Sequence, residues 1–256
     1  MLWLALMGAC VIADKQPGAI DGATIDGAAI DATAIDATAI DAVLTDAAPA
    51  CGGLTARATT RGLWCFNEGT GTTSANLFGS APSATGIVPS EWQTGGGVRP
   101  TTSTITAADH TSLDQNTGWT IEIALTVDGY PSPSNALFER AIYPAGDRWV
   151  FLALGASGQV TCEIGTNGGD AYSRRTPDNA LSLSVPHVVT CRRATSGTIS
   201  ILIDGASADT LSSGGAPHTT PHAMTEPLHF AHTTCGAPCN AQPLNGVLRG
   251  VAFHAD

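Results

Sequence analysis

Hydrophobic and polar residues alternate along several short stretches of the chain from residue 51 onward. In the clearest one, Trp119 to Val127, every second residue is large and apolar, beginning with Trp119 itself. A period of two is typical of a β-strand with one buried face, so we predict a half-buried antiparallel strand there. Comparable runs are found at residues 63–66, 149–154, 159–164, 188–192, 199–203, 228–232 and 247–253.

Turn-forming sequences lie between these runs. Examples are Ala156-Ser157-Gly158, Thr195-Ser196-Gly197 and Asp204-Gly205, in which glycine or a small polar residue supplies the turn. Many short strands joined by polar turns indicate an all-β fold with two packed sheets. We therefore predict one antiparallel jelly-roll sandwich over residues 51–256.

The region before residue 51 follows a different pattern. An aspartate recurs at every fifth position from Asp21 to Asp46. On a helix, residues five apart are rotated by about 140°, and on a strand an odd repeat changes face each time. Neither element gains an apolar face, so we interpret residues 11–50 as a disordered Ala/Ile/Asp linker that its like charges keep solvated.

The first residues form a short apolar segment, MLWLALMGACVI, without a charge. It is shorter than the about 20 residues that span a bilayer, but it fits the apolar region of a secretory signal. Its end, Met7-Gly8-Ala9-Cys10, resembles the lipobox of bacterial lipoproteins. The resemblance implies a signal peptide over 1–10, lipidation of Cys10, and an exported protein anchored to the bacterial envelope, at the outer membrane or cell surface.

The chain contains seven cysteines, and export would place them in an oxidising compartment where disulfides persist. With Cys10 lipidated, six cysteines remain for pairing. Proximity along the chain and the phase of the strands lead to three predicted disulfides. They are Cys51–Cys65, Cys162–Cys191 and Cys235–Cys239.

Four phrases of residues 51–256 resemble concanavalin A-like/laminin G-like (LamG) domains and occur in the order found in that family. They are GLWCFNEGTGTTS (62–74), ITAADHTSLDQNTGWTIEIALTV (105–127), VPHVVTCRRATSGTISILIDGASA (185–208) and PLHFAHTTCGAPCNAQPLNGVLRGVAFH (227–254). The resemblance implies a jelly roll that binds a glycan or an extracellular protein through loops at one rim of the sandwich.

LamG-like domains often bind calcium at that rim, and calcium takes oxygen ligands. The resemblance therefore makes the acids of turn-like segments candidate calcium ligands: Asp109, Asp114 and Asp170. Trp92, in SEWQTGGG, does not fit the strand periodicity. It is a candidate for stacking on a sugar ring or a partner, and packing beneath the glycine loop is the alternative.

Other chemistries have less support in the sequence. A net charge of −11 without a basic cluster argues against nucleic acid, and membrane contact is expected only through the lipid. Glycoside hydrolases need two carboxylates flanking the scissile bond, yet no two acids in 51–256 lie within four positions of each other. Histidines and cysteines in 218–239 have spacings that could hold zinc, although disulfide formation competes with that use.

We therefore predict a surface-anchored, non-catalytic binding module for a glycan or an extracellular protein. Two alternatives stay open. One is a glycoside hydrolase or lyase on the same fold. The other is a metal-binding surface protein that uses the histidine cluster, His218, His222, His229 and His232.

Overall fold

The computed structural model describes residues 51–114, 117–132, 134–142, 147–165, 171–209, 211–214, 225–232 and 242–256. Several predictions fall outside these ranges and stay predictions. They concern the lipid anchor at Cys10, the linker 11–50, Asp170, His218, His222 and the Cys235–Cys239 disulfide.

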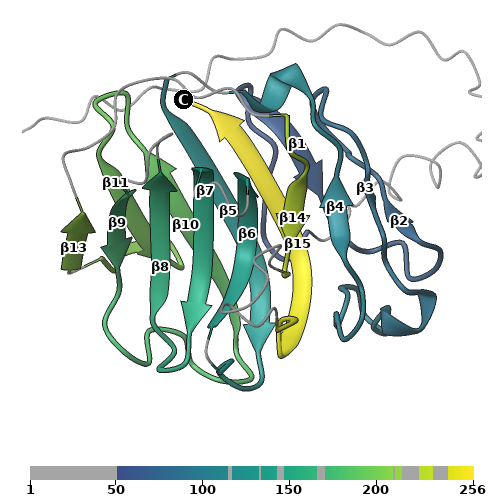
Figure 1. Ribbon diagram of the computed structural model, residues 1–256. Helices are drawn as coiled ribbons and strands as arrows, with labels where there is room; N and C mark the ends of the chain where they lie inside the picture. Colours follow the sequence, from purple (N-terminus) through teal and green to yellow (C-terminus); the bar gives the residue numbers. More distant parts are fainter. Residues whose placement is uncertain are drawn as a thin grey trace, which may run out of the picture. The chain divides into compact units, whose positions relative to one another are not determined.

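Two antiparallel sheets pack face to face (Figure 1), which confirms the predicted all-β sandwich. The described strands of the six-stranded sheet are, in spatial order, β1 (Thr60–Trp64), β15 (Gly246–Ala255), β5 (Trp119–Val127), β10 (Pro186–Arg193), β11 (Ile199–Ile203) and β12 (Ala206–Ser207). Those of the nine-stranded sheet are β13 (Leu211–Gly214), β9 (Ala171–Arg175), β8 (Val160–Gly165), β7 (Asp147–Gly155), β6 (Ser134–Ile142), β14 (Leu228–Phe230), β4 (Ile105–Ala107), β3 (Ala84–Thr85) and β2 (Thr73–Ser74).

The part of the chain that the structure describes also contains two short 3₁₀ helices in loops, η1 (Pro89–Glu91) and η2 (Thr111–Leu113). Within the described ranges no helix is long and apolar enough to cross a membrane. The strand bounds predicted for 119–127 and 199–203 agree with β5 and β11, because both stretches alternate without interruption.

Aromatic rings fill the centre of the core between the sheets. Phe230 from β14 lies 5.0 Å from Trp64, 5.7 Å from Phe138 and 6.2 Å from Phe66, measured between ring centroids. All four side chains are fully buried. Tilted and edge-on aromatic pairs at these separations add to the energy gained from burying the rings.

The outer face of β5 is also buried, so the predicted half-buried strand is wrong on this point. Ala124 packs in a second apolar cluster with Cys51, Leu54, Leu63 and Cys65. Residues 51–57, the cover segment, thus lie over the outer face of the six-stranded sheet. The backbone of the cover segment lies very close to β5. A Cβ on Gly52, which has φ +65°, would lie 2.5 Å from the Cβ of Ala124.

Two of the three predicted disulfides are confirmed. Cys51–Cys65, with Cα atoms 4.3 Å apart, joins the cover segment to the residue after β1. Cys162–Cys191, with Cα atoms 6.1 Å apart, joins β8 of one sheet to β10 of the other. The phase of the two strands predicted this second bond correctly, since both sulfurs point into the core.

The sequence pattern did not reveal β6, SNALFERAI, although it lies inside the nine-stranded sheet. The register shifts twice along its pairing with β7, between Ala136 and Phe138 and again between Arg140 and Ala141. Leu137 and Phe138 are both buried in the core. Such bulges break the period of two on which strand prediction depends.

Candidate functional site

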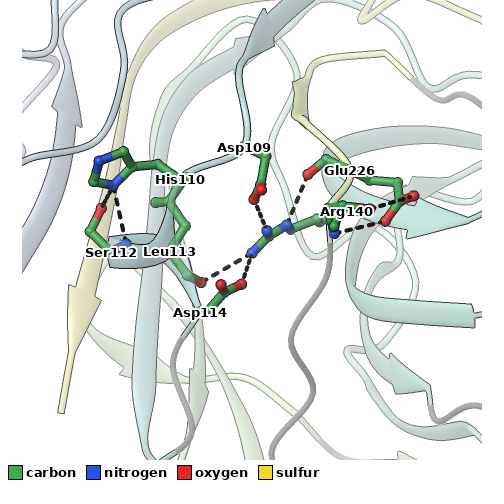
Figure 2. A network of polar contacts seen from close by, with 8 residues as sticks. Asp109, His110, Ser112, Leu113, Asp114, Arg140 and Glu226 are labelled. Carbon is green, nitrogen blue, oxygen red and sulfur yellow. Dashed lines mark hydrogen bonds and ion pairs between the residues drawn. The ribbon is translucent and has the colours of Figure 1, made fainter.

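Asp109 and Asp114, the two described calcium candidates, lie together around the guanidinium group of Arg140 (Figure 2). Asp109 pairs with Nη2, and Asp114 Oδ1 is 3.0 Å from Nη1. Two backbone carbonyls accept further hydrogen bonds from Arg140, those of Leu113 at 3.2 Å and Glu226 at 3.0 Å. This Arg140 cluster joins β6 to the loop that carries η2 and to the segment before β14.

The Arg140 side chain is fully buried, whereas those of Asp109 and Asp114 are 36% and 21% exposed. The positive charge next to the two carboxylates is therefore supplied by the guanidinium group of Arg140. Among the described residues no group of three or more His, Cys, Asp or Glu side chains is arranged to hold a metal ion. Calcium binding at Asp109 and Asp114 stays a prediction, and it would have to compete with Arg140.

Trp92 follows η1 and is half-buried against the core. Its indole Nε1 donates a hydrogen bond to the carbonyl of Gly71 at 2.9 Å, and its backbone pairs with Val98 across the turn that contains the three glycines of 95–97. These contacts correspond to the alternative named above, in which Trp92 packs beneath the glycine loop. A ligand contact by Trp92 stays a prediction.

A hollow of about 450 Å³ opens between loops at one rim of the sandwich, and we call it the rim hollow. Three segments meet there: the loop after β5, the segment 99–101, and the residues leading into β15. The lining residues are Arg99, Pro100, Thr101, Tyr130, Pro131, Ser132, Gln242, Pro243, Leu244, Asn245 and Gly246.

Tyr130 is held rigidly in this rim hollow. Its hydroxyl donates a hydrogen bond to the carbonyl of Leu181 at 2.8 Å. Its ring lies against the backbone of Gly158, where a Cβ would be 2.4 Å from the ring carbon Cζ. Gly158 also has φ +74°, so a glycine suits this position for both reasons. The half-buried Tyr130 ring is thus fixed before any ligand arrives.

The rim hollow combines apolar and polar walls. Pro100, Pro131 and Pro243 supply rigid apolar surface beside Tyr130. Arg99 forms a 2.6 Å ion pair with Asp128 through one guanidinium nitrogen. The lining set also contains two amide side chains and two hydroxyls. The hydrophobic pattern did not reveal this site, although an aromatic residue within the proline-containing segment 128–133 was the signal available.

Glu91 lies behind one wall of the rim hollow and fixes the segment 101–103. Its carboxylate accepts hydrogen bonds from Thr101 N at 2.9 Å, Thr101 Oγ1 at 2.6 Å, and Thr102 N at 2.6 Å, and from both N and Oγ of Ser103. Burial alone would raise the pKa of Glu91, but these hydrogen bonds outweigh it and lower the pKa to about 2. We call this group the Glu91 cluster.

A second hollow, of about 510 Å³, lies on the outer face of the six-stranded sheet, and we call it the sheet hollow. Glu122 of β5 stands in it, paired with Arg57 of the cover segment. Its other oxygen lies 3.3 Å from Nε2 of the buried His254, whose Nδ1 is 2.9 Å from Thr60 Oγ1. Burial raises the pKa of Glu122, but the hydrogen bond with His254 and the charge of Arg57 outweigh it and lower that pKa.

Two carboxylates, Glu122 and Asp256, line this sheet hollow, and the glycoside hydrolase alternative requires such a pair. A hydrolase of that kind needs one carboxyl group with a raised pKa as general acid. The pKa of Glu122 is shifted in the opposite direction. Asp256 accepts a 2.6 Å hydrogen bond from Thr120 and lies 3.4 Å from Arg192. Glu122 therefore lacks the raised pKa of a general acid.

His229 and His232, the described members of the histidine cluster, are close enough to influence each other. Burial, followed by the charge of His232, lowers the pKa of His229 to about 4, and burial lowers that of His232. Both imidazoles are thus neutral at pH 7. Their Nδ1 atoms are buried and have no hydrogen-bond partner among the described residues. Zinc binding by the full cluster stays a prediction.

No family model matches the chain, and no curated protein matches it in sequence. Solved structures do match its fold. Trypanosoma rangeli sialidase in complex with sialic acid matches with a TM-score of 0.54 and 14% identity, over 78% of this chain and 31% of that chain. The same sialidase with the inhibitor DANA matches with a TM-score of 0.53 and 15% identity, over 80% of this chain and 32% of that chain.

A third match is the CBM40 of a Ruminococcus gnavus IT-sialidase bound to α2,3-sialyllactose, with a TM-score of 0.46 and 17% identity over 57% of this chain and 80% of that chain. The chain spans about a third of the length of the sialidase chains it matches. At these identities the likeness concerns the fold, and the LamG assignment stays a prediction.

Proposed function

We propose that residues 51–256 form a non-catalytic glycan-binding module and that the glycan binds in the rim hollow. The observation that carries this proposal is the fixed Tyr130 ring, set among prolines and surrounded by hydrogen-bonding side chains. A pyranose ring has an apolar face of C–H groups and an edge of hydroxyls. A rigid aromatic ring fits the face, while Arg99, Gln242 and Asn245 fit the edge.

The size of the rim hollow supports the same ligand class. Small-molecule sites usually enclose about 300–1,000 Å³, and the 450 Å³ here leave room for one or two sugar rings. The polar groups are a guanidinium group, amides and hydroxyls, whose hydrogen bonds can be directional. Sialylated glycans belong in the probe set, because sialidase chains of the same fold are solved with sialic acid.

The anchor predicted from the sequence completes the proposal. A lipid on Cys10 and the charged linker 11–50 would hold the module at the cell envelope while letting it reach outward. A glycan or an extracellular protein carrying one would then be captured at the surface. A glycoside hydrolase or lyase on this fold is the alternative that the same experiment addresses.

The test is a glycan array probed with the full chain, with added calcium and with a chelator. We expect capture of a defined glycan class. Tyr130→Ala should abolish it, while Tyr130→Phe, which keeps the ring, should retain most of it. Circular dichroism would confirm that both variants fold. Unchanged capture by Tyr130→Ala would contradict the rim site, and a blank array would contradict glycan binding.

Two further readouts separate the alternatives. Capture that requires calcium and is lost in Asp114→Asn would favour the predicted calcium site. A shortened glycan recovered from the array would favour the hydrolase or lyase. Trp92→Ala serves as the comparison for the earlier candidate, because Trp92 does not line the rim hollow.

A further inference from the structure

The sheet hollow has walls built from the regular register of three strands. In one row, Glu122 of β5 pairs with Thr190 of β10, which pairs with Leu202 of β11. In the adjacent row, Thr120 pairs with Arg192, which pairs with Ser200. Since these positions belong to hydrogen-bonded strands, their side chains are held at fixed spacings, as a binding site requires.

Two arginines line this hollow, and much of each side chain is exposed to solvent. Arg57, 46% exposed, contacts Glu122 through one nitrogen, Nη2. Arg192, 59% exposed, approaches Asp256 through Nε. Among the described residues the other guanidinium nitrogens of both side chains have no partner. Planar guanidinium groups with free N–H edges favour an oxyanion, which they can bind through two parallel hydrogen bonds.

Hydroxyl groups complete the floor between the arginines. Thr190, Ser200 and Ser207 line the sheet hollow together with Thr120. A hydroxyl can donate to an oxyanion or accept from a sugar hydroxyl. Thr120 already donates its hydroxyl hydrogen to Asp256, which leaves the hydroxyls of the other three residues and the two guanidinium groups to face a ligand. The two carboxylates already face Arg57 and Arg192.

We propose that the sheet hollow is a second binding site, which takes the carboxylate or sulfate group of a small polar ligand between Arg57 and Arg192. The site lies on the outer face of the six-stranded sheet and shares no lining residue with the rim hollow. It stands whether or not a glycan binds at Tyr130.

Several contacts prepare Arg57 for this role. Its own backbone N–H donates to Thr60 Oγ1, the same hydroxyl that contacts His254. The cover segment that carries it is joined to the end of β1 by the Cys51–Cys65 disulfide. Glu122 and Asp256 hold the two guanidinium groups in place and neutralise part of their charge. Binding is accordingly weak and falls as salt screens the arginines.

The test is a titration of the ¹⁵N-labelled full chain, followed through backbone amide shifts, with three probes: glucuronate, glucose 6-sulfate and neutral glucose. We expect both anions to shift the amides of Thr190 and Ser200 at millimolar concentrations, and glucose to leave these two amides unchanged. Binding of any of the three sugars in the rim hollow would be seen separately, as a shift of the Tyr130 amide. A response to only one anion would identify the group as carboxylate or sulfate.

Arg192→Gln removes one guanidinium group and should weaken binding of the anion by about tenfold or more, the usual loss for one charge-assisted hydrogen bond. The matched control is Arg175→Gln, since Arg175 is an exposed arginine of β9 on the other sheet. Equal affinity in Arg192→Gln and the wild type would overturn the proposal. So would an equal response to glucose, or no response to either anion.

Discussion

The Arg140 cluster and the Glu91 cluster bury opposite charges, and the protein satisfies them in different ways. Arg140 is surrounded by two carboxylates and two backbone carbonyls. Within the described ranges, the Glu91 carboxylate accepts from hydroxyls and backbone N–H groups of residues 101–103, and no cation contacts it there. One buried charge is thus neutralised by opposite charges, and the other is stabilised by dipoles alone.

Because of this difference, we expect the two clusters to contribute differently to the stability of the fold and to binding in the rim hollow. The Arg140 cluster ties together three segments that do not line the rim hollow, whereas the segment held by Glu91 includes Thr101, a lining residue. Removing Arg140 should therefore weaken the fold while leaving the rim hollow intact. Changing Glu91 should affect both the stability of the fold and the shape of the rim hollow.

Arg140→Met should have the largest effect. The variant keeps the length of the side chain but leaves two carboxylates and two carbonyls without their buried donor, which costs about 3–5 kcal/mol when one partner of a buried ion pair is removed. Urea unfolding of the full chain measures the loss. Arg175→Met, at an exposed arginine, should change the unfolding free energy by about 0.5 kcal/mol or less. Equal losses in the two variants would refute the buried-charge explanation.

Glu91 should control part of the acid stability. Its pKa of about 2 in the folded protein lies below the ordinary value of 4.5, so at low pH the unfolded chain takes up the proton first. The stabilisation, about 3 kcal/mol from a shift of this size, is fully present above pH 4.5 and is lost as the pH falls toward 2. We expect Glu91→Gln to lack this part of the pH dependence. Parallel stability curves for the variant and the wild type between pH 4.5 and 2 would contradict this.

The sequence predicted the sandwich because most strands show one apolar face, and it predicted Cys162–Cys191 because that bond follows from strand phase. It could not predict the cover segment, since residues 51–57 have no periodic pattern and their position depends on the Cys51–Cys65 bond.

The polar clusters were harder to predict from the sequence. Arg140 stands in a bulged strand without alternation, so nothing local distinguishes it from an exposed arginine. Asp109 and Asp114 were predicted as calcium ligands, which stays a prediction, and the guanidinium group that lies between them comes from a strand some thirty positions away. Glu91 becomes recognisable only when the chain folds back and places residues 101–103 against it. Tyr130 becomes recognisable only when segments distant in sequence meet around it, because local composition does not encode such contacts.

Glu91→Gln should also weaken glycan capture at the rim hollow by about fivefold, because a neutral amide cannot satisfy all the donors of residues 101–103 and the wall beside Tyr130 loosens, at roughly 1 kcal/mol. The measurement is the Kd of the best glycan from the array, taken at pH 7. Arg140→Met, assayed under conditions where it stays folded, provides the contrast and should bind within about twofold of the wild type. A larger loss in Arg140→Met than in Glu91→Gln would reverse the assignment of the two clusters.

The smallest effects should come from the single carboxylates around Arg140. Because two acids share this cation, Asp109→Asn leaves Asp114 in place, and the reverse variant leaves Asp109. Asp109 is the more exposed of the two, so its loss should cost less than about 1 kcal/mol, in the range of solvent-exposed ion pairs. Asp114→Asn should cost more than Asp109→Asn. The double variant should cost more than the sum of the two, since only then does the buried guanidinium lose both opposite charges. Strict additivity in urea unfolding would mean that the two acids do not share the charge of Arg140, and that the carbonyls of Leu113 and Glu226 suffice to hold it.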